Sequence, residues 1–251
     1  MKFIDQLKEK AKQNKKTIVL PETSDMRTIE AAGKVLAEGI ANIILVGDKE
    51  DIMSRAGDID LSGASFVDPK NYEKFDEYVD AFVEMRRKKG MTEARAKELL
   101  LTNPLYFGCM MVKQDDADGM VAGAINASAD VLRAALQTLK TAPGTRIVSA
   151  FFLVVVPDCQ YGANGTFVFA DAGLNQSPSA SELADIAEQS AKSFELLVDE
   201  TPVVAMLSHS TKGSAKHPDV DKVIEATEIV NAEFPDLLCD GELQSDAALV
   251  P

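Results

Sequence analysis

Short apolar runs alternate with segments of helical periodicity along most of this chain, and this alternation constrains the fold more than any other feature. Thr17–Pro21 and Asn42–Val46 have the character of strands, and each is followed by a segment with the spacing of an amphipathic helix. Strands separated by helices favour parallel pairing, with the helices packed on the faces of the sheet. The pattern therefore predicts an α/β protein with mostly parallel sheets.

The same signals place the remaining elements. Further helices are expected at 3–11, 25–38, from 48 onward, and at 71–89, 92–101, 104–113, 128–140, 179–198 and 219–233. Further strands are expected at 64–67, 119–124, 146–156, 203–207 and 237–239, with a hairpin over 161–170. Asn164-Gly165 supplies the hairpin turn, and Ser179 with Glu182 forms a capping-box pattern.

Thr141–Thr145 (TAPGT) is the strongest linker candidate in the chain. It predicts a first α/β domain over residues 1–142 and a second over residues 143–251. Ala247–Pro251 begins an apolar segment that simply stops. Because a domain does not usually end inside an element, we expect a C-terminally truncated chain.

The charge balance excludes some partners. A net charge of −14, from 40 acidic and 26 basic residues, argues against non-specific binding to nucleic acid or an anionic membrane, since both need a basic face. The N-terminus has no long apolar stretch of a signal peptide or membrane anchor. Three scattered cysteines and two histidines, with no CxxC pair, predict a cytoplasmic protein without a structural metal.

One arginine stands out on the helix expected at 71–89. Spacing residues at 100° gathers its apolar side chains on one face, namely Tyr72, Phe75, Tyr78, Val79, Phe82, Val83 and Met85. Arg86 points within roughly 40° of that face, whereas Arg87 points more than about 100° away and is expected to be solvated. Two interpretations of Arg86 remain open: an internal salt bridge, or a cation facing a substrate.

Ala122–Arg133 (AGAINASADVLR) combines a strand end, a loop of small residues and a helix start. Free backbone N–H groups at such a position bind phosphate or carboxylate. We expect Ser128 or Asp130 to cap the helix. Arg133 in the first turn would oppose the helix dipole, which favours a nearby anion. An ordinary capped helix without a ligand is the alternative.

Ser208–Ala215 (SHSTKGSA) also lies between an expected strand and helix. Its possible ligand-binding groups are hydroxyls, one charge and a flexible turn, supplied by Ser210, Thr211, Lys212, Gly213 and Ser214. The order differs from the GxxxxGK[ST] of a P-loop, and a solvated polar turn would have the same composition.

Several runs resemble the phosphate acetyltransferase family. The longest are Ser149–Cys159 (SAFFLVVVPDC), Leu207–Ala215 (LSHSTKGSA) and Asp240–Ala248 (DGELQSDAA). Shorter ones are Leu20–Thr23 (LPET) with Arg27, Asn42–Gly47, Gly119–Arg133 and Phe169–Gly173 (FADAG). The similarity runs from the first helix to the last residue without an evident gap.

The resemblance implies reversible acetyl transfer between coenzyme A and inorganic phosphate, by direct attack of the CoA thiolate on acetyl phosphate in a ternary complex. Acetyl phosphate, phosphate and CoA would be substrates, and no cofactor or metal would be bound permanently. The resemblance also implies a homodimer, with two three-layer α/β/α domains similar to isocitrate and isopropylmalate dehydrogenases and the site in the cleft between them.

The family's two early active-site arginines match Arg86 and Arg133, so the resemblance and the helical periodicity both select Arg86. The Ser208–Ala215 loop would bind substrate from the opposite side. Where the family often has His-Ser-Thr, this chain has Asn126, Ala127 and Ser128, which leaves Ser128 as the hydroxyl ligand. Family members continue beyond DGELQ with a Ser-Arg pair and an aspartate base, so the resemblance predicts little or no turnover by this chain.

Three alternatives remain. A phosphate butyryltransferase shares the fold and takes a longer acyl group. A dehydrogenase of the isocitrate type would need a metal-binding carboxylate set and a nicotinamide site. A non-catalytic fragment would bind ligand poorly or only dimerise.

Overall fold

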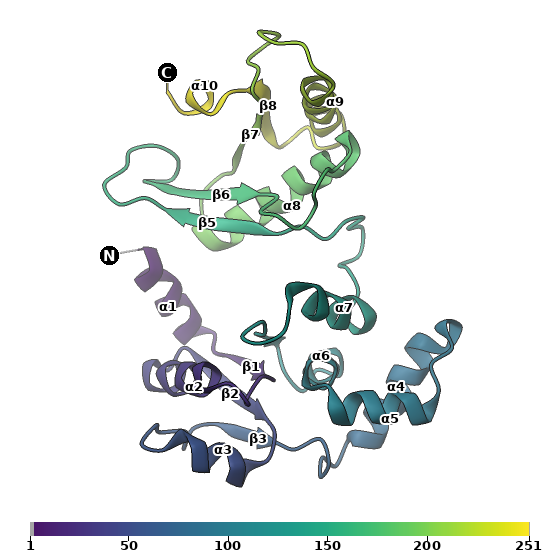
Figure 1. Ribbon diagram of the computed structural model, residues 1–251. Helices are drawn as coiled ribbons and strands as arrows, with labels where there is room; N and C mark the ends of the chain where they lie inside the picture. Colours follow the sequence, from purple (N-terminus) through teal and green to yellow (C-terminus); the bar gives the residue numbers. More distant parts are fainter. Residues whose placement is uncertain (1–2, 251) are drawn as a thin grey trace. The chain divides into compact units, whose positions relative to one another are not determined.

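The computed structural model describes residues 3–250, and the chain divides into two compact units, Met1–Lys140 and Thr141–Pro251 (Figure 1). The first unit contains a four-stranded sheet in the order β3-β2-β1-β4. Its strands are β1 (Lys16–Leu20), β2 (Ala41–Val46), β3 (Ser65–Val67) and β4 (Gly119–Met120), all paired in parallel. The carboxyl ends of β1 and β4 therefore lie side by side at one edge of the sheet.

Helices surround this sheet. They are α1 (Phe3–Gln13), α2 (Met26–Glu38), α3 (Lys49–Ala56), α4 (Phe75–Arg86), α5 (Glu93–Thr102), α6 (Pro104–Lys113) and α7 (Ser128–Thr138). A short 3₁₀ turn at Arg87–Lys89 follows α4. Local chemistry sets most of the starts, because the Asp25, Asp48, Thr92 and Asn103 side chains accept hydrogen bonds from backbone N–H groups in the first turns.

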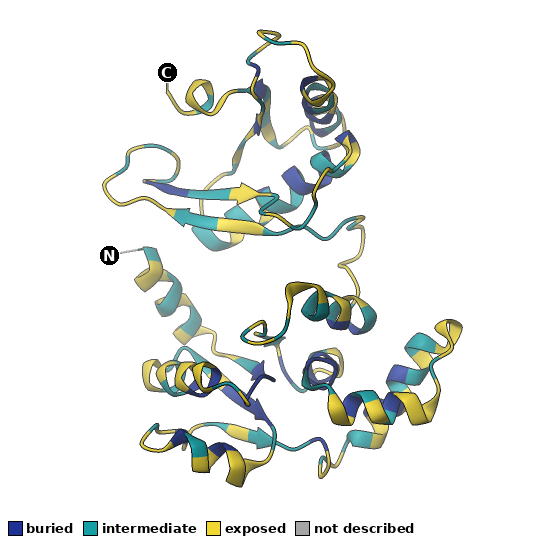
Figure 2. Cartoon of the chain, in the orientation of Figure 1, coloured by how far each residue is buried: buried dark blue, intermediate teal, exposed yellow. Residues whose placement is uncertain are grey.

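The sheet of the first unit is covered on both faces. Val19, Ile44 and Val46 pack with buried residues of α4, α5 and α6. Leu20, Ile43 and Leu45 point the other way and pack on α2 and α3. Neighbouring residues of one strand thus enter different cores, as the two-residue period of a strand requires. In Figure 2 the buried residues of this unit gather on the strands and the helix faces turned toward them.

The second unit contains two separate two-stranded sheets. β5 (Phe151–Val155) pairs antiparallel with β6 (Thr166–Ala170), and β7 (Val203–Leu207) pairs parallel with β8 (Leu238–Leu243). Its helices are α8 (Ala180–Val198), α9 (Pro218–Glu233) and α10 (Ser245–Leu249). The predicted capping box of Ser179 and Glu182 is present at the start of α8. α8 and α9 enclose a small core with Met206 of β7.

The predicted α/β fold with mostly parallel pairing is confirmed. Several boundaries are wrong. α4 begins at Phe75 rather than at residue 71, and the strand expected at 119–124 ends at Met120. β5 occupies only the second half of its expected range, and β8 runs four residues beyond Cys239. Asn164-Gly165 does form a tight turn, closed by hydrogen bonds between Ala163 and Thr166, but β6 pairs mainly with β5.

Candidate active site

Arg86, the last residue of α4, is half-buried. Its Nε is buried and has no hydrogen-bond partner, and no carboxylate within residues 3–250 pairs with the guanidinium. The interpretation of Arg86 as an internal salt bridge is therefore wrong for the described chain. Arg87, by contrast, is exposed and pairs with Glu84 at 3.0 Å, as expected for a solvated arginine.

Tyr106 on α6 connects α4 with α7. Its ring lies 5.8 Å from the ring of Phe82 on α4, and its hydroxyl donates to Gln137 Oε1 on α7 at 3.2 Å. Burial raises the pKa of Tyr106, while the positive charges of Arg133 and Arg86 both act to lower that pKa. Arg86 ends α4 and Arg133 lies on α7, the two helices that Tyr106 contacts. The two predicted catalytic arginines therefore lie on helices that contact the same residue, and their catalytic role stays a prediction.

Arg133 is exposed on the second turn of α7 and forms an ion pair with Asp130 at 2.5 Å. The expectation of an uncompensated cation in the first turn is wrong, because the helix begins at Ser128 and Asp130 balances the charge. The expected cap is wrong as well. Ala127 occupies the cap position with no side-chain hydrogen bond, and Ser128 is the exposed first residue of the helix.

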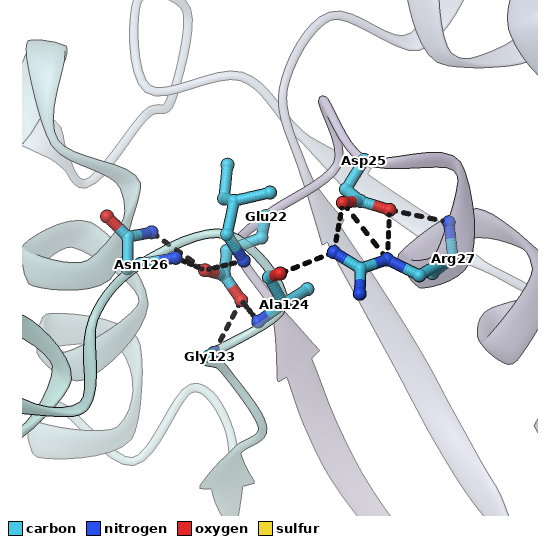
Figure 3. Close-up of polar contacts among 7 residues, drawn as sticks. Glu22, Asp25, Arg27, Gly123, Ala124 and Asn126 are labelled. Carbon is cyan, nitrogen blue, oxygen red and sulfur yellow. Dashed lines mark hydrogen bonds and ion pairs between the residues drawn. The ribbon is translucent and has the colours of Figure 1, made fainter.

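The loop between β4 and α7 closes around the side chain of Glu22, which follows β1 (Figure 3). Glu22 Oε2 accepts hydrogen bonds from the N–H groups of Gly123 (2.6 Å) and Ala124 (2.7 Å). Oε1 accepts from the N–H groups of Ile125 (3.1 Å) and Asn126 (2.8 Å), and from Asn126 Nδ2 (2.7 Å). The N–H groups expected to bind an external anion at 123–126 already bind this carboxylate.

Glu22 is only 2% exposed, so its ionisation depends on these donors. Burial alone would raise the pKa of Glu22. The hydrogen bonds from Asn126, Ala124 and Ile125 outweigh burial and lower the pKa from 4.5 to about 2. The loop therefore holds a permanent negative charge at neutral pH.

A second contact holds the same loop. Arg27, at the start of α2, forms a paired interaction with the Asp25 carboxylate and also donates from Nη2 to the Ala124 carbonyl at 2.5 Å (Figure 3). The loop is thus tied through its N–H groups by Glu22 and through a carbonyl by Arg27.

The second unit repeats this arrangement with different donors. Glu242 of β8 is 2% exposed and accepts from the Ser210 hydroxyl at 2.9 Å and from the Gly213 N–H at 2.7 Å. The Gly213 hydrogen bond, helped by Ser210, holds the pKa of Glu242 below its usual value. The loop after β7 is therefore wrapped around a carboxylate from the neighbouring strand.

The other predicted ligand-binding groups of this loop also have partners within the unit. Ser214 Oγ accepts from the Thr211 N–H at 2.9 Å, and Thr211 Oγ1 accepts from the Gln244 N–H at 2.9 Å. Lys212 Nζ pairs with Asp240 and donates to the Gly241 carbonyl at 2.8 Å. Their contact with a substrate stays a prediction.

Glu22, Tyr106 and Glu242 were not identified as site residues from the sequence. Glu22 could have been found from its position, since an acid directly after a strand and beside a Gly/Ala-rich loop of the adjacent strand is a candidate partner for the loop's N–H groups. Tyr106 gives no such local signal.

Within residues 3–250, no group of three or more His, Cys, Asp and Glu residues gathers in a way that could hold a metal ion. The same stretch holds no helix with the length and apolarity needed to cross a membrane.

Comparison with known proteins decides the family. The family model described as phosphate acetyl/butaryl transferase matches residues 2–251. The chain belongs to this family. The resemblance drawn from the sequence motifs is thereby confirmed.

Individual relatives agree with this membership. The chain is 53% identical over 251 residues to a phosphate acetyltransferase of Acetivibrio thermocellus, covering 100% of this chain and 75% of that protein. It is 54% identical over 250 residues to a phosphate acetyltransferase of Thermoanaerobacterium thermosaccharolyticum, covering 100% and 76%. A phosphotransacetylase structure from Streptococcus pyogenes superposes with a TM-score of 0.89 at 42% identity, covering 99% of this chain and 74% of that one.

Proposed function

We propose that this member of the phosphate acetyl/butaryl transferase family is a phosphate acetyltransferase whose acyl phosphate is bound by Arg86 and Arg133. The family match over residues 2–251 supports the reaction. The position of both arginines on helices that contact Tyr106 supports the choice of these residues. The reaction is acetyl-CoA + phosphate = acetyl phosphate + CoA.

The chemistry suits two guanidiniums. In the proposed step, the CoA thiolate attacks the carbonyl carbon of acetyl phosphate in a ternary complex. A C–S bond forms, the bond between carbonyl carbon and phosphate oxygen breaks, and the electron pair leaves with phosphate. Planar guanidiniums bind phosphate oxygens through paired hydrogen bonds and stabilise the charge that grows as phosphate departs. Arg86 is half-buried, and its Nε has no hydrogen-bond partner within the described chain.

The remaining predicted residues take supporting roles in this proposal. Ser128 offers an exposed hydroxyl at the start of α7, where the helix dipole favours an anion. Lys212 offers a cation whose side chain remains 54% exposed beside Asp240. Ser210, Thr211, Gly213 and Ser214 shape the loop that carries Lys212, because their polar groups are engaged with Glu242, with Gln244 and with one another.

The proposal includes the wider features implied by the family resemblance. These are CoA as a substrate with no permanently bound cofactor or metal, a homodimer, and a cytoplasmic location. Domains at 1–142 and 143–251, of the isocitrate and isopropylmalate dehydrogenase type, belong to the same proposal.

A direct assay tests the reaction. The purified chain is incubated with acetyl phosphate and CoA, and the thioester absorbance of acetyl-CoA is followed, with butyryl phosphate as the parallel substrate. The proposal predicts thioester formation that requires both substrates and is faster with the acetyl compound. Failure to form thioester contradicts the proposal for this chain. Faster reaction of butyryl phosphate would instead support the longer-chain alternative.

A further inference from the structure

All the hydrogen-bond accepting positions of the buried Glu22 carboxylate are occupied. Two backbone N–H groups bind one oxygen, and two more with the Asn126 side chain bind the other. A carboxylate has about four lone-pair sites, so no further donor is needed. A buried charge is tolerated only when it is compensated in this way. The contact is therefore specific for a carboxylate, not for a generic polar side chain.

The loop that Glu22 binds has few other anchors. Val121 and Ile125 are 62% and 56% exposed, so apolar packing contributes little to its position. Ala127 provides no side-chain cap for α7. Within residues 3–250, the hydrogen bonds of residues 123–126 all run to Glu22, apart from the contact of Arg27 with the Ala124 carbonyl.

The loop leads directly into the helix that carries Ser128 and Arg133. α7 is anchored farther along by Ala134 and Thr138, which are completely buried. An α-helix transmits a displacement of its first turn to the next, since its hydrogen bonds join successive turns. The hydrogen bonds between Glu22 and residues 123–126 therefore constrain where α7 places the Arg133 side chain.

We propose that Glu22 is a positioning residue for acetyl transfer: it occupies the anion-binding loop at 123–126, fixes the start of α7 and thereby sets where Arg133 meets the substrate phosphate. This inference rests on the proposed function. It also explains how the substrate anion is directed to guanidiniums, since the loop N–H groups are already occupied by an anion of the chain itself.

Three variants provide the test. Glu22→Gln keeps the shape and removes the charge, which leaves five donors facing one accepting oxygen. Glu22→Ala removes the carboxylate and leaves space for a small anion. Glu30→Gln is the matched control, because Glu30 is an exposed residue of α2. All proteins are assayed at a temperature at which circular dichroism shows them to be folded.

Misplacement by about 1 Å can cost about 100-fold in rate, so we expect kcat/KM for acetyl phosphate to fall at least about tenfold in Glu22→Gln. Glu30→Gln should match the unsubstituted protein within about twofold. Formate, which can occupy the vacated carboxylate position, should restore part of the activity of Glu22→Ala and leave the unsubstituted protein unchanged. A defect in global folding would not respond to formate in this way.

Amide hydrogen exchange gives a readout that needs no turnover. Exchange at residues 123–133 should be at least about tenfold faster in Glu22→Gln than in Glu30→Gln. Unchanged kcat/KM in Glu22→Gln, with an active unsubstituted protein, overturns the inference. If the unsubstituted protein does not turn over acetyl phosphate, the proposed function fails, and unchanged exchange at 123–133 then overturns the positioning role separately.

Discussion

Two loops of this protein each bind a buried glutamate of the neighbouring parallel strand or of the segment just after it, but they do so through different groups. The loop after β4 binds Glu22 mainly through backbone N–H groups, from Gly123 to Asn126. The loop after β7 binds Glu242 through the Ser210 hydroxyl as well as the Gly213 N–H. In both cases the carboxylate stands where an external anion could otherwise bind.

The two loops differ in the groups that hold them: mainly backbone N–H groups in the first loop, and side chains as well in the second. Backbone contacts fix the first loop, and the side chains of Ser128 and Arg133 that follow it are exposed, Arg133 in an ion pair with Asp130. In the second loop the side chains themselves hold the structure. We therefore expect substitutions of Ser128 and Arg133, which follow the first loop, to affect activity more than stability. Substitutions of the side chains that hold the second loop should affect stability more than activity.

Acid titration gives the largest expected stability effect. The folded pKa of Glu22 is about 2, below its usual 4.5. Its stabilisation is therefore fully present above pH 4.5 and is lost as the pH falls toward 2. Through this window the protein should lose up to about 3 kcal/mol of unfolding free energy from this group. Urea unfolding at successive pH values measures the loss.

Glu22→Gln removes that titration, so its stability should fall less steeply with acid than that of the unsubstituted protein. Glu30→Gln should follow the unsubstituted protein. Equal slopes of unfolding free energy against pH for Glu22→Gln and Glu30→Gln would show that the loop does not stabilise an ionised Glu22. That result would contradict the account of the first loop.

A substitution in the second loop should produce a smaller effect. Ser210 is completely buried, donates to Glu242 and accepts from the Ala215 N–H at 3.1 Å. Ser210→Ala leaves both partners short of a hydrogen bond, which should cost about 1–3 kcal/mol of unfolding free energy. Urea unfolding monitored by circular dichroism measures this, with the exposed Ser177 as control. Equal stabilities of Ser210→Ala and Ser177→Ala would contradict the role of Ser210 in holding the loop.

Much of the fold follows from local pattern. α6 lies where it was predicted because Asn103 caps it and Pro104 suits its first position. Arg86 was separated from Arg87 because helical periodicity distinguishes neighbouring residues by about 100°. The end of β4 could not be predicted in this way. An apolar run suggests a strand through Ala124, but Glu22, about one hundred residues earlier, draws the backbone N–H groups away.

The same limit applies to the site. The N–H groups after β4 were expected to bind an anion, and they do, but the anion belongs to the chain. Local sequence identifies the donors and not the partner that parallel pairing of β1 with β4 brings beside them. The Asp130–Arg133 pair lies within one helix, and it was missed because the helix start was expected to be capped by a side chain.

The adjacent arginines at the end of α4 test the central claim most directly. Acetyl-CoA formation from acetyl phosphate and CoA is measured for Arg86→Ala and Arg87→Ala. Arg86 is half-buried and its Nε has no hydrogen-bond partner, whereas Arg87 is exposed and paired with Glu84. We predict that Arg86→Ala lowers kcat/KM by about 100-fold or more, as expected for a lost charge contact in the transition state. Arg87→Ala should stay within about twofold of the unsubstituted protein. Equal effects of the two substitutions would contradict the proposed site.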